Sequence, residues 1–134
     1  FPVNLEAPEF GAYKKALTIL QKQEALMIFP EGGRSPDGNL MPFKEGAARL
    51  ALKTGAPILP VLVQGGGQVW SAEMRVPRPR KVVVNYLRLI STPSIRAGNK
   101  DEFEKAAASL TRQIHDTLEA ALRQKPPLRA VGLR

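Results

Sequence analysis

One short stretch of the chain holds the residues best suited to chemistry, Glu31-Gly32-Gly33-Arg34-Ser35. The carboxylate can accept hydrogen bonds from hydroxyl groups, and the guanidinium offers a planar fork of donors that matches a phosphate. Two adjacent glycines let the backbone approach a ligand closely and leave amide groups free to donate. This combination suits a phosphorylated alcohol. Taken alone, the residue types favour an ordinary turn with Glu31 and Arg34 paired on the surface, because short motifs often match by chance.

The elements around this stretch predict where it lies in the fold. The apolar run at 25–29 predicts a buried strand, so Glu31 would follow the carboxyl end of that strand. Ligands bind at such positions in open α/β sheets. Residues 35–38 have the composition of a type I turn. We therefore expect a loop over 30–42 to carry the candidate site.

The remaining apolar patterns predict helices over 8–20, 44–54 and from Asn99 to the prolines at 126–127, with Gly55 ending the second helix. They also predict strands over 57–63 and 81–90, and a loop at 65–67. This order predicts an α/β fold with a mixed, largely parallel sheet flanked by helices. We expect one domain over 1–125, followed by a basic tail at 126–134.

Composition limits the kinds of site that the chain can build. Its 134 residues contain no cysteine and one histidine, which excludes a disulfide framework, a thiolate nucleophile and a Cys-built metal site, and leaves no histidine cluster. We therefore expect no metal. Lysine and arginine number 20 against 12 acidic residues, and the net charge of +8 favours anionic partners.

A basic cluster later in the chain could meet anionic lipid headgroups, although a solvated loop and strand edge would look the same. Its members are Arg75, Arg78, Arg80, Lys81 and Arg88. Trp70 suits either a core or a membrane interface, and we expect it in the core. Only 6% of residues are aromatic and none interleave with the basic cluster, so nucleic acid is an unlikely partner. No apolar run is long enough to cross a bilayer, and no signal peptide is found.

Several sequence blocks resemble the glycerophospholipid acyltransferases, the lysophosphatidate (1-acylglycerol-3-phosphate) acyltransferase family. Phe29-Pro30-Glu31-Gly32-Gly33-Arg34-Ser35 is similar to the family's FPEG-[TG]-RS block. Pro42-Phe43-Lys44-Glu45-Gly46-Ala47 is similar to its PFKxGA helix start, and Pro57-Ile58-Leu59-Pro60-Val61 to its proline-containing strand. Blocks that agree in order and spacing are a strong signal, and these cover about residues 1–65.

The resemblance implies transfer of an acyl chain from coenzyme A or acyl carrier protein to a hydroxyl of glycerol 3-phosphate or its lyso derivative, in phospholipid biosynthesis. It implies an enzyme with no bound cofactor, peripheral to the cytoplasmic face of a membrane. Pro30 and Pro60 would shape the wall of the site. The residues expected to hold the phosphorylated acceptor are Glu31, Gly32, Gly33, Arg34, Ser35 and Lys44. A solvated side chain is the simpler interpretation for Lys44.

The chain departs from the family pattern at two points. The family's catalytic His-x-x-x-x-Asp block is absent, because His115 is followed at once by Asp116 and the residue five positions on is Ala120. We expect His115 to be a surface histidine of a helix. Leu5 stands where the family commonly has a phosphate-binding arginine. Since the chain also begins with Phe1, we expect a partial acyltransferase domain that is inactive alone.

The alternative is a basic, noncatalytic module that binds anionic lipid, acyl carrier protein or nucleic acid. The residues do not distinguish the acyl donor, the chain length or the exact acceptor.

Overall fold

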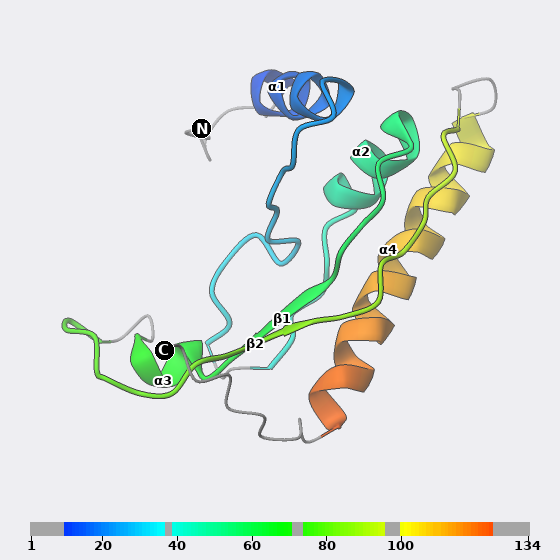
Figure 1. The fold of residues 1–134 in the computed structure, drawn as a ribbon. Coiled ribbons are helices and arrows are strands. Elements are labelled where there is room, and N and C mark those ends of the chain that lie inside the picture. Colours follow the sequence, from blue (N-terminus) through cyan, green and yellow to red (C-terminus); the bar gives the residue numbers. More distant parts are fainter. Residues whose placement is uncertain (1–9, 37–38, 71–73, 96–99, 125–134) are drawn as a thin grey trace.

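The computed structural model describes residues 10–36, 39–70, 74–95 and 100–124. Expectations that fall on Leu5, Pro8, Asp37-Gly38, Asn99 and the tail at 126–134 lie outside these ranges. In chain order the elements are α1 (Phe10–Gln21), α2 (Gly46–Thr54), β1 (Val61–Gln64), α3 (Gly66–Val69), β2 (Val83–Tyr86) and α4 (Lys100–Arg123). The described residues thus form a mixed α/β structure (Figure 1).

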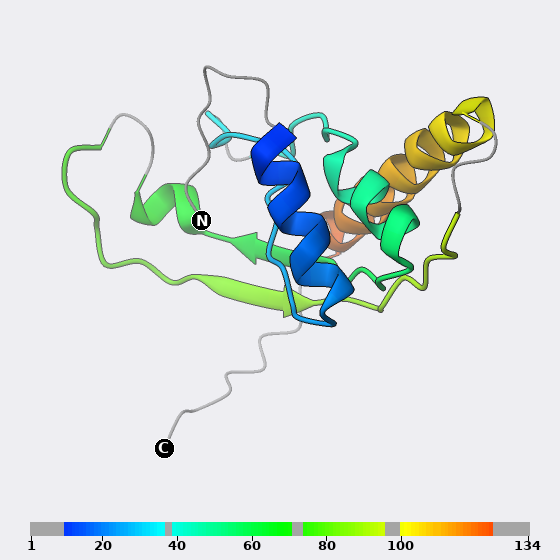
Figure 2. The same cartoon turned by 90° about the horizontal axis from the view of Figure 1, so that it is seen from above.

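The core lies where α2 and β1 pack against α4, with α1 lying on α2 (Figures 1 and 2). One face of α4 is buried at helical spacing, which confirms the amphipathic helix that the sequence predicts. Its buried residues are Phe103, Ala107, Leu110, Ile114 and Leu118. From α2 the buried partners are Ala48, Ala51 and Leu52, and from β1 Leu62.

Local chemistry explains the helix ends. Asp101 and Glu102 lie in the first turn of α4 and Arg123 in its last, where their charges complement the helix dipole. Gly55 ends α2 with a left-handed φ of 72°, and its N–H donates to the Ala51 carbonyl at 2.7 Å. This is the glycine C-cap that the sequence predicts.

The two strands form an antiparallel ribbon in which Val61 pairs with Tyr86 and Gln64 with Val83. A bridge between Ile58 and Ile90 continues the pairing beyond the strand ends. The largely parallel sheet that we expected is therefore not formed by the described residues. The helix between the two strands, α3, has four residues, whereas the crossover between parallel strands is usually a much longer α-helix. Strands that follow each other in this way readily pair antiparallel.

The expected buried strand at 25–29 is wrong for the described structure. This segment has no regular secondary structure, and Met27 and Phe29 are 82% and 73% exposed. A strand is buried on both faces only when other strands flank it. Here β1 and β2 pair with each other, and no backbone–backbone hydrogen bond joins 25–28 to another described residue.

The expected loop at 65–67 is also wrong, because Gly66 begins the short helix α3. Gly65 caps it with a φ of 86°, and a Cβ there would lie 2.4 Å from the Lys81 carbonyl oxygen. Only glycine allows this close approach of α3 to the backbone that leads into β2. Gly65 therefore allows α3 to lie beside the ribbon.

Candidate functional site

The candidate site is a loop whose two ends are joined by the backbone. The Lys44 N–H donates to the Pro30 carbonyl at 2.8 Å, and the Gly32 N–H donates to the Phe29 carbonyl at 3.1 Å. Lys44 directly precedes Glu45, the N-cap residue of α2, so the far end of the loop is tied to the helical core. The loop is thereby closed at its base, with the predicted site residues at its start and end.

Glu31 holds the loop from within. Its Oε2 accepts a hydrogen bond from the Met41 N–H at 2.9 Å, and the side chain is half-buried. The surface ion pair between Glu31 and Arg34, which the residue types alone favoured, is not formed. One carboxylate oxygen is thus used by the loop, and the other can accept a hydrogen bond from a ligand.

Gly32 brings the Lys44 ammonium group against the backbone of the loop. Gly32 has a φ of 71°, which side-chain-bearing residues rarely adopt. A Cβ at this position would lie 2.8 Å from both Cε and Nζ of Lys44. The glycine therefore makes room for the lysine, and a cation comes to lie beside the Gly32-Gly33 pair.

Arg34 lies over the ring of Trp70, with Cζ 5.6 Å from the ring centroid. Trp70 is 53% exposed, so our expectation that it packs in the core is wrong. Its indole N–H donates to the Met74 carbonyl at 3.0 Å, which holds the ring at the surface under the guanidinium. No described carboxylate forms an ion pair with Arg34.

The structure brings some of the predicted site residues together and leaves others apart. Lys44 contacts both Pro30 and Gly32, and Glu31 is hydrogen-bonded to Met41 on the far side of the same loop. Ser35 is half-buried and follows Arg34 directly. Pro60 is buried, and its carbonyl accepts a hydrogen bond from the Leu87 N–H at 3.0 Å, so its visible role is in the ribbon. Its place in the site wall stays a prediction.

His115 approaches the loop from α4 and is half-buried, so it is less exposed than the surface histidine that we expected. Its ring meets Phe43 edge-on, with centroids 5.0 Å apart and planes at 74°. With Asp116 and Glu119 it places three possible metal ligands within 4.8 Å of one another. Glu119 already pairs with Arg123 at 2.8 Å and Asp116 is exposed, so an ordinary helix surface accounts for the group.

An ion-pair network fixes α2, and with it the end of the loop, to α4. Arg49 donates to Glu45 on its own helix and to Glu104 on α4. The hydrogen bonds from Arg49 lower the pKa of the Glu104 carboxyl, and they raise the pKa of the guanidinium itself. This network is the main electrostatic link between the elements that carry the site.

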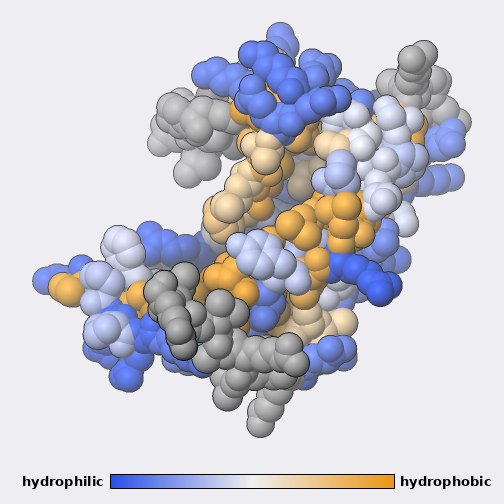
Figure 3. All heavy atoms as spheres, in the orientation of Figure 1, coloured by the Kyte–Doolittle hydropathy of each residue, from blue (hydrophilic) through white to orange (hydrophobic). Residues whose placement is uncertain are grey.

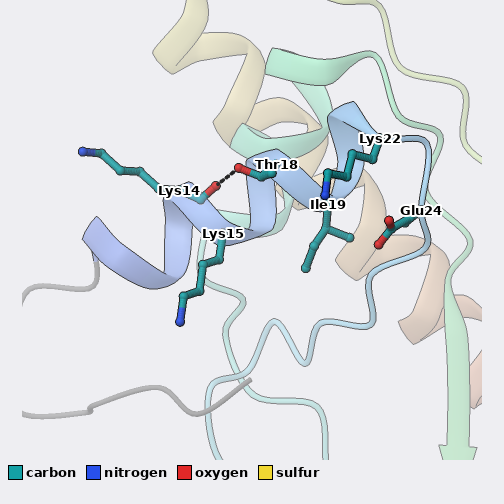
Figure 4. A pocket seen from close by; sticks show the side chains of 6 residues that line it. All are labelled: Lys14, Lys15, Thr18, Ile19, Lys22 and Glu24. Carbon is teal, nitrogen blue, oxygen red and sulfur yellow. Dashed lines mark hydrogen bonds between the residues drawn. The ribbon is translucent and has the colours of Figure 1, made fainter.

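A separate depression of about 330 Å³ lies beside α1 (Figure 4). Lysines and one carboxylate surround an apolar floor at Ile19, and none of the predicted site residues takes part. Its lining residues are Lys14, Lys15, Thr18, Ile19, Lys22 and Glu24. Among the described helices, none is both long and apolar enough to cross a membrane.

Comparison with known proteins points to one family. Residues 5–64 match the family model described as Acyltransferase. A 1-acyl-sn-glycerol-3-phosphate acyltransferase of Limnanthes alba is 37% identical over 111 residues, which are 82% of this chain and 37% of that protein. The enzyme of that name from Saccharomyces cerevisiae is 34% identical over 103 residues, covering 75% and 33% respectively. The matched part of the chain thus spans about a third of the length of these relatives.

The fold agrees with a solved structure. The crystal structure of the 1-acyl-sn-glycerophosphate acyltransferase PlsC from Thermotoga maritima superposes with a TM-score of 0.60 at 25% identity, covering 87% of this chain and 46% of that one. The residues that match the family model include the loop with Glu31, Arg34 and Lys44. Sequence and fold together show that this chain is similar to a part of the 1-acyl-sn-glycerol-3-phosphate acyltransferases.

Proposed function

We propose that this chain supplies the acceptor-binding part of an O-acyltransferase of phospholipid biosynthesis. The enzyme would move an acyl chain from coenzyme A or acyl carrier protein to a hydroxyl of glycerol 3-phosphate or lysophosphatidate. One observation carries this proposal: the loop places the Lys44 ammonium against Gly32, two residues before a guanidinium that no described carboxylate neutralises. Two cations on one closed loop match the charge of a phosphate monoester.

Different groups of the loop would bind the phosphate end and the hydroxyl end of such an acceptor. Arg34 and Lys44 would bind the phosphate, and the free carboxylate oxygen of Glu31 would accept a hydrogen bond from a glycerol hydroxyl. Gly33 has open space, since a Cβ there would meet only Met41 Cε, at 3.9 Å. Gly33 and Ser35 would line the same face of the loop.

The acceptor hydroxyl must lose a proton as it attacks the thioester carbonyl. A positioned general base contributes roughly 10²–10⁴ in rate. The one histidine of this chain, His115, packs against Phe43 and lacks an aspartate five positions on. We therefore infer that the base belongs to another part of the enzyme, and that this chain binds acceptor without turnover.

The exposed segment at 25–29 supports the role of a partial domain. Met27 and Phe29 are large apolar side chains in contact with solvent, and apolar surface lies between α1 and the ribbon (Figure 3). The chain covers 46% of the Thermotoga maritima structure. We propose that 25–29 forms a strand of a larger, largely parallel sheet in the whole acyltransferase domain, which would bury these side chains.

The basic cluster favours an anionic membrane surface as a further partner, at the cytoplasmic face. All five of its members are exposed. Cations near an anionic leaflet contribute about 1 kcal/mol each. Flotation with vesicles that contain acidic lipids would support peripheral binding, whereas binding to nucleic acid with a steep salt dependence would favour the noncatalytic alternative.

Calorimetric titration with sn-glycerol 3-phosphate and lysophosphatidate tests the proposal. We expect saturable binding that Arg34→Gln weakens about 10- to 100-fold, because a charge-assisted hydrogen bond contributes about 1.5–3 kcal/mol. Arg112→Gln removes another exposed positive charge, on α4 and outside both the loop and the basic cluster, and serves as the matched control. Equal losses in both variants would mean that net charge alone, and not the loop, attracts the ligand. Thioester release by the isolated chain would contradict the inference that the general base belongs to another part of the enzyme.

A further inference from the structure

We propose that Trp70 is a positioning residue that holds the Arg34 guanidinium ready for phosphate. This inference rests on the proposed function, because it assigns to a residue outside the loop the task of orienting one of the loop's cations. Arg34 and Trp70 are far apart in sequence, and the fold brings Arg34 Cζ to 5.6 Å from the indole centroid. That distance lies within the range of a cation–π interaction.

Trp70 is a fixed platform. Its backbone N–H caps α3 by donating to the Gly66 carbonyl at 2.9 Å, and its indole N–H donates to the Met74 carbonyl at 3.0 Å. Next to it, the Val69 carbonyl accepts a hydrogen bond from the Arg78 N–H at 2.8 Å, which links the end of α3 to the segment that leads into β2. Both the main chain and the ring of Trp70 are therefore held.

Arg34, in contrast, is an exposed side chain on the loop, without an ion-pair partner among the described carboxylates. An arginine in that position samples many rotamers unless something orders it. A guanidinium that lies over an indole within the range of a cation–π interaction still has N–H groups that can donate to a phosphate. The arginine is thus ordered by the ring without losing its donors.

The same contact also selects the residue type at position 34. A lysine ammonium is a compact charge without a flat face, so it could not both stack on the ring and present a fork of donors. We therefore expect Arg34→Lys to keep the charge but to lose most of the benefit of Trp70. The Arg34→Lys variant therefore distinguishes positioning by Trp70 from simple electrostatic attraction.

The first experiment examines the contact without ligand. Trp70 is the single tryptophan of the chain, so tryptophan fluorescence reports on this ring alone. We expect Arg34→Gln to change the emission intensity of the free protein, while the control Arg112→Gln leaves it unchanged. Unchanged emission in Arg34→Gln would overturn the inference, even if glycerol 3-phosphate still binds as proposed.

The second experiment measures binding of sn-glycerol 3-phosphate by calorimetry. We expect Trp70→Ala to weaken binding about two- to fivefold, and Trp70→Phe, which keeps an aromatic face, to restore most of it. In an Arg34→Gln background Trp70→Ala should have no further effect, because the arginine that it positions is gone. An equal loss in both backgrounds would overturn positioning and indicate a general structural role.

A third arm separates this proposal from a membrane role for the exposed indole. If Trp70→Ala weakens flotation with anionic vesicles but leaves affinity for sn-glycerol 3-phosphate unchanged, the ring serves the membrane and the inference is overturned. If the unaltered chain binds no glycerol 3-phosphate at all, the proposed function fails for this chain and the inference falls with it. The ligand-free fluorescence result distinguishes failure of the inference from failure of the proposed function, because it reports on the contact between Arg34 and Trp70 without any acceptor.

Discussion

The helical side of the molecule and its loop side are held in place by different means. On the helical side, α2 and α4 bury small and branched apolar side chains, with Ala107 fully buried and Leu52 2% exposed. On the loop side, the described residues 24–36 and 39–44 have no regular secondary structure, and a few named hydrogen bonds fix them. Stability therefore resides mainly in the first region, and the candidate chemistry in the second.

This contrast matters for function, because contacts in the loop can be changed with little cost to the fold. Glu31, Gly32 and Lys44 are held by a few local contacts, and none of them lies in the buried core. Substitutions on the helical side should unfold the chain, whereas substitutions in the loop should change ligand binding first. The following experiments test that division.

The largest effect should come from Leu52→Ala on the helical side. Removing a buried leucine side chain costs about 2–5 kcal/mol, a large share of the stability of a domain this size. Urea unfolding followed by circular dichroism measures the loss. Leu59→Ala is the matched control, since Leu59 is 47% exposed and should cost far less. Similar losses in both variants would contradict the assignment of the core to α2 and α4.

Gly32→Ala should have the next largest effect, and mainly on binding. The left-handed φ costs a residue with a Cβ about 1–2 kcal/mol, and the new methyl group would displace the Lys44 ammonium. Gly11→Ala in α1 is the control, because a Cβ at Gly11 would have open space and lies outside the loop. We expect calorimetry to show weaker binding of glycerol 3-phosphate in the first variant only. Unaltered binding in Gly32→Ala would remove Lys44 from the site.

Glu31→Ala should cost about 1 kcal/mol of local stability, because the Met41 N–H loses its acceptor. Hydrogen exchange at the Met41 amide measures this directly, and protection should fall. Glu31→Gln keeps an acceptor oxygen and should retain most of the protection. If both variants exchange alike, the carboxylate does not hold the loop, and Glu31 would act on the ligand alone.

The smallest effect concerns pH. Arg49 lowers the pKa of Glu104 in the folded chain, so the folded state binds fewer protons than the unfolded state between the two pKa values. This contribution to stability is present above the unfolded pKa of the carboxyl group. It is lost as pH falls through the lower, folded pKa.

Urea midpoints measured across the acidic range test this linkage. We expect Glu104→Gln to flatten the acidic limb of the stability curve. Asp116→Asn, which removes an exposed carboxylate outside the network, should leave that limb unchanged. A limb that is equally steep in Glu104→Gln and the unaltered chain would mean that the Arg49 network does not contribute.

The sequence by itself determined the elements whose signals are local. Apolar spacing predicted α1, α2 and α4, because a helix repeats its buried face every three or four residues. Gly55 predicted the end of α2, since few other residues adopt its left-handed conformation. The block from Phe29 to Ser35 predicted both the candidate loop and the family, because residue types at fixed spacing define that motif.

Only the tertiary structure decided which surfaces meet. Periodicity shows that a face is apolar but not which segment covers it, so the exposed 25–29 run and the antiparallel ribbon were both missed. Trp70 looked like a core residue because nothing near it in sequence indicates Arg34, and His115 gave no sign of its contact with Phe43. Such contacts join segments distant along the chain, and they follow from how the elements pack rather than from any local preference of the residues that make them.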